Sequence, residues 1–145
     1  MFKHILVPTD GSELADKAAM QAIEVAKSLG SKLTFVRITA PPAPIVIEGV
    51  VVAYPAEELR AQMKERVTSH LGGLDAAAKT AGVSSASLHV EHDQPWKAII
   101  ESAERIGADL IMMGSHGRKG VAALVIGSET HKVLTHTKLP VLVCR

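Results

Sequence analysis

The sequence predicts one α/β domain: an open parallel sheet of five strands, in the order 3-2-1-4-5, with helices on both faces. Short apolar runs typical of strands alternate with segments whose apolar residues recur every three or four positions. Such alternation builds parallel sheets with right-handed crossovers. The length of 145 residues corresponds to about one domain, and no linker, repeat or low-complexity tract divides residues 1–145.

The first strand and the first helix follow from a short apolar run and a turn. Ile5-Leu6-Val7 stops at Pro8, which predicts a buried strand, and Thr9–Ser12 carries turn and helix-cap residues. From Leu14 to Leu29 the apolar residues recur at helical spacing. Gly30 stands where a C-terminal helix cap belongs.

A second strand, an irregular stretch and a long helix come next. Lys32–Thr39 is predicted as a strand, whereas Ala40–Pro55 contains four prolines and is the least regular part of the chain. Its middle, Ile45–Ala53, is strongly apolar, so it is expected to cover something or to be covered. From Ala56 to Ala81 a helical apolar pattern keeps its phase across two adjacent glycines, which predicts one helix.

Three strands and two helices complete the alternation. Ala86–His92 alternates apolar and polar residues, which predicts a half-buried edge strand. A helix is expected over Trp96–Ile106 and a strand that is apolar on both faces over Asp109–Met113. Ser128–Thr137 and Pro140–Cys144 are predicted as the last helix and the last strand.

Composition excludes several classes of function. Sixteen Lys and Arg against fifteen Asp and Glu give a net charge of +1, so nucleic acid is not expected as the main partner. The longest apolar run, Val121–Ile126, is far shorter than a membrane span, and the N-terminal residues do not form a signal peptide. With Cys144 as the only cysteine no intrachain disulfide can form. A cytoplasmic location without a membrane partner is expected.

The residues with special chemistry gather after strands 1 and 4. Ligands of open α/β sheets bind beyond the carboxyl ends of the strands where strand order reverses, which here lies between these two strands. The loops leaving them are Pro8–Ser12 and Gly114–Gly127. Glycines and the helix start at Gly127-Ser128 can present backbone N–H groups to an anion, and the Ser128 hydroxyl can cap the helix or bind a phosphate. Alternatively, the glycines only shape the connection, since neither a Walker loop nor a dinucleotide fingerprint is present.

Three blocks of the chain resemble the universal stress protein family. They are Ile5–Ser12, Ala108–Gly117 and Leu139–Val143, and the pattern Gly114-x2-Gly117-x9-Gly127-Ser128 is similar to that family's nucleotide-binding motif. The resemblance covers essentially the whole chain. It implies a Rossmann-like domain that binds ATP and usually forms a homodimer. Any Mg²⁺ ion is expected to bind mainly through the phosphate oxygens.

The resemblance also implies roles for individual residues. Asp10 would contact the ribose or a phosphate-bound metal, unless it only starts the turn and caps the helix. Arg37 stands where many family members have His, a position outside the expected contacts, and the role of the Ile45–Ala53 loop is not carried over. The backbone of Ile38 would meet the adenine. The implied phosphate-binding residues are Gly114, Gly117, Gly127 and Ser128, with the amides of Glu129 and Thr130, and the residues lining the cleft are Pro8, Thr9 and Met113.

Other sequence patterns give weaker indications of function. The histidines do not have the spacing of a protein metal site, no Gly-x-Ser-x-Gly motif occurs, and Cys144 is expected to be a small buried apolar residue. The final strand, Val141-Leu142-Val143, is predicted as a sheet edge that pairs with the same strand of a second copy, or that is shielded by Arg145.

The sequence therefore favours an ATP-binding regulatory protein of the universal stress type that acts by binding. One alternative is a slow ATP hydrolase or phosphotransferase, for which Asp10 and His116 are conceivable bases. The other is a dimeric interaction module that binds no nucleotide.

Overall fold

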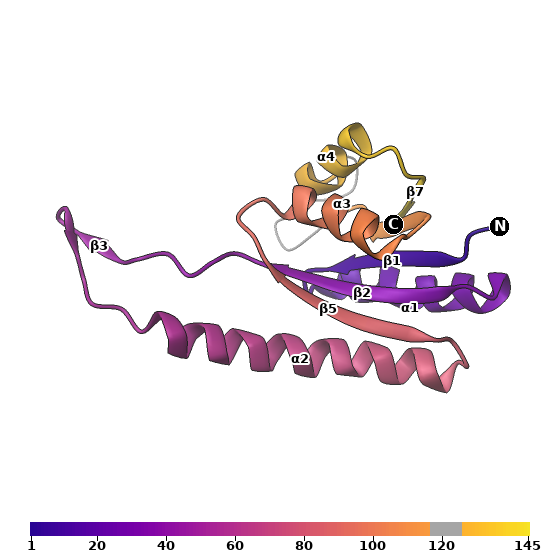
Figure 1. Cartoon of the computed structure of the whole chain (residues 1–145), viewed down its shortest axis with the longest axis horizontal. Coiled ribbons are helices and arrows are strands. Elements are labelled where there is room, and N and C mark those ends of the chain that lie inside the picture. The colour runs from indigo at the N-terminus through magenta and orange to yellow at the C-terminus, as the bar shows by residue number, and fades with distance from the viewer. Residues whose placement is uncertain (117–125) are drawn as a thin grey trace.

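Five parallel strands form the centre of the computed structural model, which describes residues 1–116 and 126–145 (Figure 1). The elements in chain order are β1 (His4–Thr9), α1 (Glu13–Leu29), β2 (Lys32–Thr39), β3 (Val46–Ile47), β4 (Val50–Val51), α2 (Ala56–Thr80), β5 (Ser85–Glu91), α3 (Pro95–Ile106), β6 (Leu110–Gly114), α4 (Ser128–His136) and β7 (Val141–Cys144).

The order of strands in the sheet is β5-β2-β1-β6-β7, and all neighbouring strands are parallel. Counted among these five strands alone, this is 3-2-1-4-5, so the predicted fold class and strand order are confirmed. β1 lies at the centre, paired with β2 from His4↔Lys32 to Thr9↔Arg37 and with β6 at Ile5↔Leu110. β5, predicted as a half-buried edge strand, is at the edge.

Each face of the sheet is covered by two helices. Ile5 and Val7 of β1 belong to the core cluster shared with α1 and α2, whereas Leu6 belongs to the cluster shared with α3 and α4. This alternation follows from the two-residue period of a strand, and burial on both faces is typical of a central parallel strand. Phe35 is the largest fully buried side chain, and α1 packs through a stripe made mostly of alanine, so the core is built from small and aliphatic side chains as the composition requires.

The helix boundaries match the local chemistry of the sequence. Ser12 is the N-cap of α1, and its Oγ accepts a hydrogen bond from the N–H of Ala15 at 3.2 Å. Gly30 is the C-cap with φ 68°, a left-handed conformation that glycine adopts without a Cβ penalty. α2 runs unbroken through the glycine pair at 72 and 73, as predicted.

The stretch between β2 and α2 differs from the prediction of irregular structure. It contains a hairpin of two antiparallel two-residue strands, β3 and β4, joined by Glu48 and Gly49 with φ 49° and 81°. Positive φ at both residues is the signature of the tight turn that suits a hairpin. Strands of two residues are too short to show an alternation of apolar and polar residues, which explains why the sequence did not reveal them. Among the described residues no helix is long and apolar enough to cross a membrane.

Candidate functional site

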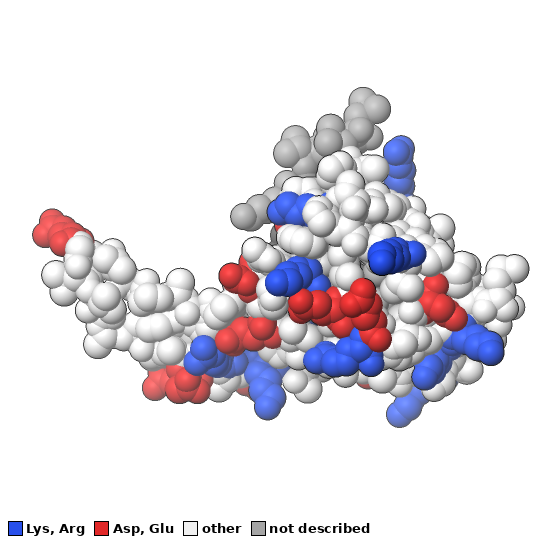
Figure 2. Space-filling model, turned by 45° about the horizontal axis from the view of Figure 1, so that its top comes forward, with Lys and Arg blue, Asp and Glu red and all other residues white. Residues whose placement is uncertain are grey.

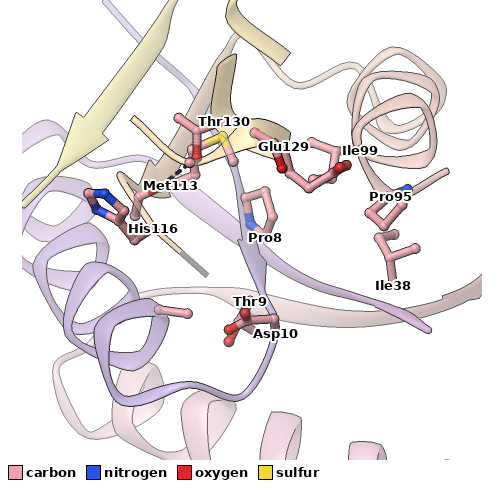
Figure 3. A pocket seen from close by; sticks show the side chains of 14 residues that line it. Pro8, Thr9, Asp10, Ile38, Pro95, Ile99, Met113, His116, Glu129 and Thr130 are labelled. Atoms are coloured by element: carbon pink, nitrogen blue, oxygen red, sulfur yellow. Dashed lines mark hydrogen bonds between the residues drawn. The ribbon is translucent and has the colours of Figure 1, made fainter. Parts of the chain in front are cut away.

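A cavity of about 480 Å³ lies where the strand order reverses, at the carboxyl ends of β1 and β6 (Figure 3). The starts of α1, α3 and α4 complete its walls. Its lining residues are Pro8, Thr9, Asp10, Ala15, Ile38, Pro95, Ile99, Met113, Gly114, His116, Gly127, Ser128, Glu129 and Thr130. A volume of this size is typical of a site for a small organic ligand.

The structure brings together the residues that the sequence singled out. Those that line this one cavity are Pro8, Thr9, Asp10, Ile38, Met113, Gly114, Gly127, Ser128, Glu129 and Thr130. The remaining one, Gly117, lies in residues 117–125, outside the described part of the chain.

The β1–α1 loop is held by side chains at its own start. Asp10 Oδ1 accepts a hydrogen bond from the N–H of Ser12 at 2.9 Å, and Thr9 Oγ1 accepts one from the N–H of Gly11 at 3.1 Å. Asp10 therefore shapes the turn, but the suggestion that it caps α1 is wrong because Ser12 is the cap. The Asp10 carboxylate remains part of the cavity wall.

Arg37 supports this loop, a contact that the sequence did not indicate. Gly11 has φ 77°, and a Cβ built on it would collide with the Arg37 guanidinium. Arg37 itself is only 7% exposed. The guanidinium thus packs the loop against β2, and a side chain at position 11 would have to displace it.

A second contact links the loop to α2. His70 Nε2 lies 2.8 Å from Asp16 Oδ1, and the same oxygen is 3.5 Å from Thr9 Oγ1. Asp16 is in the first turn of α1. The chain of contacts from His70 through Asp16 to Thr9 therefore connects the middle of α2 to the wall of the cavity.

The start of α4 is fixed against the end of β6. Thr130 Oγ1 donates to the carbonyl oxygen of Gly114 at 3.0 Å, and the N–H of Gly127 donates to the carbonyl oxygen of Ser115 at 2.7 Å. The predicted capping role of Ser128 is wrong, since Gly127 occupies the cap position and no side chain caps α4. The N–H groups of Ser128 and its two successors have no acceptor within the helix, and an anion can bind such groups.

The Glu129 side chain joins α4 to α3. Its Oε2 accepts a hydrogen bond from the N–H of Trp96 at 2.9 Å, and its Oε1 lies 3.2 Å from Lys132 Nζ. The cap residue of α3, Gln94, makes no side-chain capping bond, so Glu129 satisfies one of the free N–H groups at that helix start. The two helix starts that border the cavity are thereby held together.

Sequence reasoning missed part of the wall. Pro95 and Ile99 come from α3 and Ala15 from α1, and Pro95 and Ile99 lie with Ile38 on one apolar side of the cavity (Figure 3). The sequence predicted Ile99 only as part of the helix over Trp96–Ile106. Which end of a helix borders a site depends on packing between distant elements, so no local pattern revealed these residues.

His116, considered above only as a conceivable base, also lines the cavity. Its Nδ1 lies 3.0 Å from Ser115 Oγ, and its Nε2 is buried without a hydrogen-bond partner in the described part of the chain. A buried polar atom of this kind needs a partner, which a polar ligand in the cavity can supply. Within residues 1–116 and 126–145 no group of three or more His, Cys, Asp or Glu side chains is placed to hold a metal ion.

Comparisons with known proteins agree with this architecture. The model of the universal stress protein family matches residues 1–145. A putative universal stress protein of Staphylococcus haemolyticus is 33% identical over 148 residues, covering 99% of this chain and 85% of the relative.

Solved structures show the same fold. A universal stress family protein from Burkholderia pseudomallei has a TM-score of 0.77 and 26% identity, covering 99% of this chain and 96% of the other. A universal stress protein solved in complex with cAMP has a TM-score of 0.73 and 23% identity, covering 99% and 97%. Since both the family model and a relative that is one-third identical span nearly the whole sequence, this chain belongs to the universal stress protein family.

Proposed function

We propose that the chain binds ATP in the cavity between β1 and β6 and acts as a regulatory protein through that binding rather than through turnover. The observation that carries the proposal is the uncapped start of α4, which lies in the same cavity as an apolar wall. A helix start attracts phosphates, and an apolar slot suits a nucleobase. An adenine nucleotide combines phosphates and a nucleobase in one ligand.

The two ends of the cavity suggest how the nucleotide lies. In Figure 3, Ile38, Pro95 and Ile99 gather on one side, which we assign to the adenine, and His116 lies on the opposite side. We assign the ribose or a phosphate-bound Mg²⁺ to Asp10, which follows β1 and lines the cavity. We assign the phosphates to the backbone of Gly114, Gly127 and Ser128, with the amides of Glu129 and Thr130.

Relatives of the same fold support a nucleotide as the ligand class. Besides the protein solved with cAMP, a universal stress protein from Archaeoglobus fulgidus was solved in complex with dAMP, with a TM-score of 0.65 and 18% identity. Both ligands consist of adenine, a sugar and one phosphate. The choice of ATP over a monophosphate rests on the glycine motif and on the resemblance to the ATP-binding members of the family.

The outer edge of β7 supports a homodimer. β7 has β6 on one side only, and Leu142 is 42% exposed. An edge strand with open backbone groups can pair with the same strand of a second copy across a twofold axis. We therefore propose a dimer formed through Val141, Leu142 and Val143, in a protein that works in the cytoplasm.

Thermal melting with and without ATP and Mg²⁺ tests the binding proposal. A ligand at 100 times its dissociation constant stabilises a protein by about 2.7 kcal/mol, which raises the melting temperature by several degrees for a domain of this size. We expect the shift to vanish in Gly127→Val, whose side chain would obstruct the start of α4. Gly73→Val is the matched control, because this exposed glycine of α2 has open space around its missing Cβ.

The absence of any shift at millimolar ATP, together with no nucleotide released on denaturation, would contradict the proposal. The nucleotide-free dimeric module would then be favoured.

A second candidate function is slow ATP hydrolysis with His116 as the base. Its partnerless Nε2 in the cavity is where a base for ATP hydrolysis would stand. Steady phosphate release that stops in His116→Ala while ATP still binds would favour a slow hydrolase. Under the binding proposal, phosphate release stays at the level of the buffer in both proteins.

A further inference from the structure

The stretch between β2 and α2 forms an apolar projection, residues 40–55, which we call the arm. Figure 1 shows it reaching away from the sheet, with the β3–β4 hairpin at its far end. The hairpin side chains are exposed by 38% to 66%: Ile45, Val46, Ile47, Val50, Val51 and Val52. The only charged residue of the arm is Glu48, at its tip, and Figure 2 shows this acidic end on an otherwise uncharged projection.

A hairpin of this kind is poorly stabilised by its own contacts. Its two strands pair through two residues each, and the sheet they form has no third strand within residues 1–116 and 126–145. Isolated two-stranded hairpins are marginal in water, and a contiguous exposed apolar surface marks an interaction site. The arm therefore needs an apolar surface to pack against.

A suitable surface lies on the N-terminal part of α2. The first buried residue of this helix is Val67, so residues 56–66 add no side chain to the core, although Arg60 bonds to Glu91 at the end of β5. Here Leu59 and Met63, 42% and 37% exposed, line a groove of about 250 Å³ together with the base of the arm at Ala40 and Pro42. We call it the α2 groove.

Charge complementarity and the length of the arm indicate that the arm of another copy occupies the α2 groove. Of the two arginines in the groove, Arg60 pairs with Glu57 and Glu91, whereas Arg66 forms no ion pair in the described part of the chain. The single carboxylate of the arm, Glu48, thus matches the one unpaired cation of the groove.

The lengths of the arm and of the first part of α2 favour an exchange of arms between two copies over an arm that folds back onto its own groove. Residues 40–48 span about 30 Å when extended, whereas residues 56–66 of α2 are only about 16 Å long. In Figure 1 the hairpin lies beyond the start of α2, and none of its residues lines the groove. Two arms of equal length that run side by side in opposite directions bring each hairpin to the other copy's groove.

We infer that two copies of this chain hold each other by exchanging arms, each hairpin packing into the α2 groove of the other. This contact is isologous, because the same hairpin and the same groove are used twice. It involves neither the nucleotide cavity nor the edge of β7. Together with the proposed β7 pairing it supplies a second twofold contact, and the assembly then grows beyond a dimer.

Disulfide trapping between two single-cysteine chains tests the exchange. In a Cys144→Ser background, a size-tagged Ile47→Cys chain is mixed with an untagged Met63→Cys chain at micromolar concentration and oxidised. We expect a mixed disulfide, which can form only between two copies. Ala76→Cys, on an exposed position in the far half of α2, replaces Met63→Cys as the control. A yield of mixed disulfide no greater than with this control overturns the inference.

Two further variants separate the arm from other contacts. Leu142→Lys places a charge on the edge of β7, so trapping that persists in this background does not depend on β7 pairing. Glu48→Arg and Arg66→Glu should each raise the dissociation constant about tenfold in sedimentation equilibrium, and the double variant should restore it. A double variant as weak as the single ones overturns the pairing of Glu48 with Arg66. Stabilisation by ATP is unaffected throughout, so failure here is distinct from failure of the nucleotide proposal.

Discussion

The carboxylate of Glu129, in the first turn of α4, accepts a hydrogen bond from the backbone N–H of Trp96, in the first turn of α3, at 2.9 Å. Glu129 comes after residues that were expected to hold phosphate, and Trp96 follows a proline that lines the apolar side of the cavity. This hydrogen bond therefore links the starts of the two helices that border the site.

Removing this bond is expected to affect both stability and binding. Glu129→Ala leaves the N–H of Trp96 without its partner, so we predict a loss of about 1 kcal/mol in the free energy of unfolding, as for a lost helix cap, and a several-fold weaker affinity for ATP. Urea unfolding and titration calorimetry measure the two effects. Lys132→Ala is the control, since it removes only the exposed ion pair to Glu129, and exposed pairs contribute little. Equal effects of the two substitutions would contradict the role of the Trp96 bond.

Gly11→Ala is expected to lower the free energy of unfolding more than alanine does at another glycine with a positive φ. Gly11 and Gly30 have similar φ values, 77° and 68°, but only at Gly11 would a Cβ meet another group, the Arg37 guanidinium. Gly30→Ala should cost about 1–2 kcal/mol from backbone strain alone. Gly11→Ala should cost more and also weaken ATP binding, because the β1–α1 loop must move. Chemical denaturation of both variants checks this, and equal losses would show that the collision is relieved at no cost.

Asp10→Asn is expected to separate the structural role of Asp10 from its role toward ligand. The amide oxygen of Asn can still accept the hydrogen bond from the N–H of Ser12, so this support of the turn is kept. The affinity for ATP with Mg²⁺ should fall several-fold, since the negative charge facing the ribose or the metal is gone. Calorimetry with both proteins measures this, and an unchanged affinity would leave Asp10 only its role in the turn.

Acid is expected to destabilise the protein through His4. Burial, and then the charge of Lys32, lowers the pKa of His4 below 6.5, and its Nε2 lies 2.8 Å from Thr34 Oγ1. Below pH 6.5 the unfolded chain therefore binds a proton that folded His4 does not, and the free energy of unfolding falls as the pH drops from 6.5 toward the folded pKa.

The fall in stability below pH 6.5 should be shallower in His4→Gln than in the parent protein. Urea unfolding at pH 7.5, 6.5 and 5.5 measures the slope for each. His131→Gln, at an exposed position on α4, should keep the parent's slope. Identical slopes in all three proteins would show that His4 does not carry the effect.

The architecture was predictable because it depends on patterns that the chain repeats. Alternating strand and helix periodicities imply a parallel sheet, and special residues after strands 1 and 4 converge at its carboxyl edge. The sequence did not reveal features that depend on contacts between residues far apart in the chain. The Arg37 contact with Gly11 joins β2 to the β1–α1 loop, and Pro95 borders the cavity only because α3 packs beside α4. The error at Ser128 was a shift of one position at a helix start, where boundaries are least certain from sequence.

β1 comes first in chain order among the five strands of the sheet and is also its central strand. Its neighbour β6 follows about a hundred residues later, and the carboxylate of Asp109 binds the backbone N–H groups of Lys3 and His4 at 2.8 Å and 3.0 Å. A growing chain can pair β1 with β2 early, but the other half of the sheet must wait until β6 and β7 have been made. Contacts between such distant residues slow folding, so the apolar edge of β1 is exposed for most of that time. A ligand bound between β1 and β6 could therefore stabilise the chain only after β6 has been made.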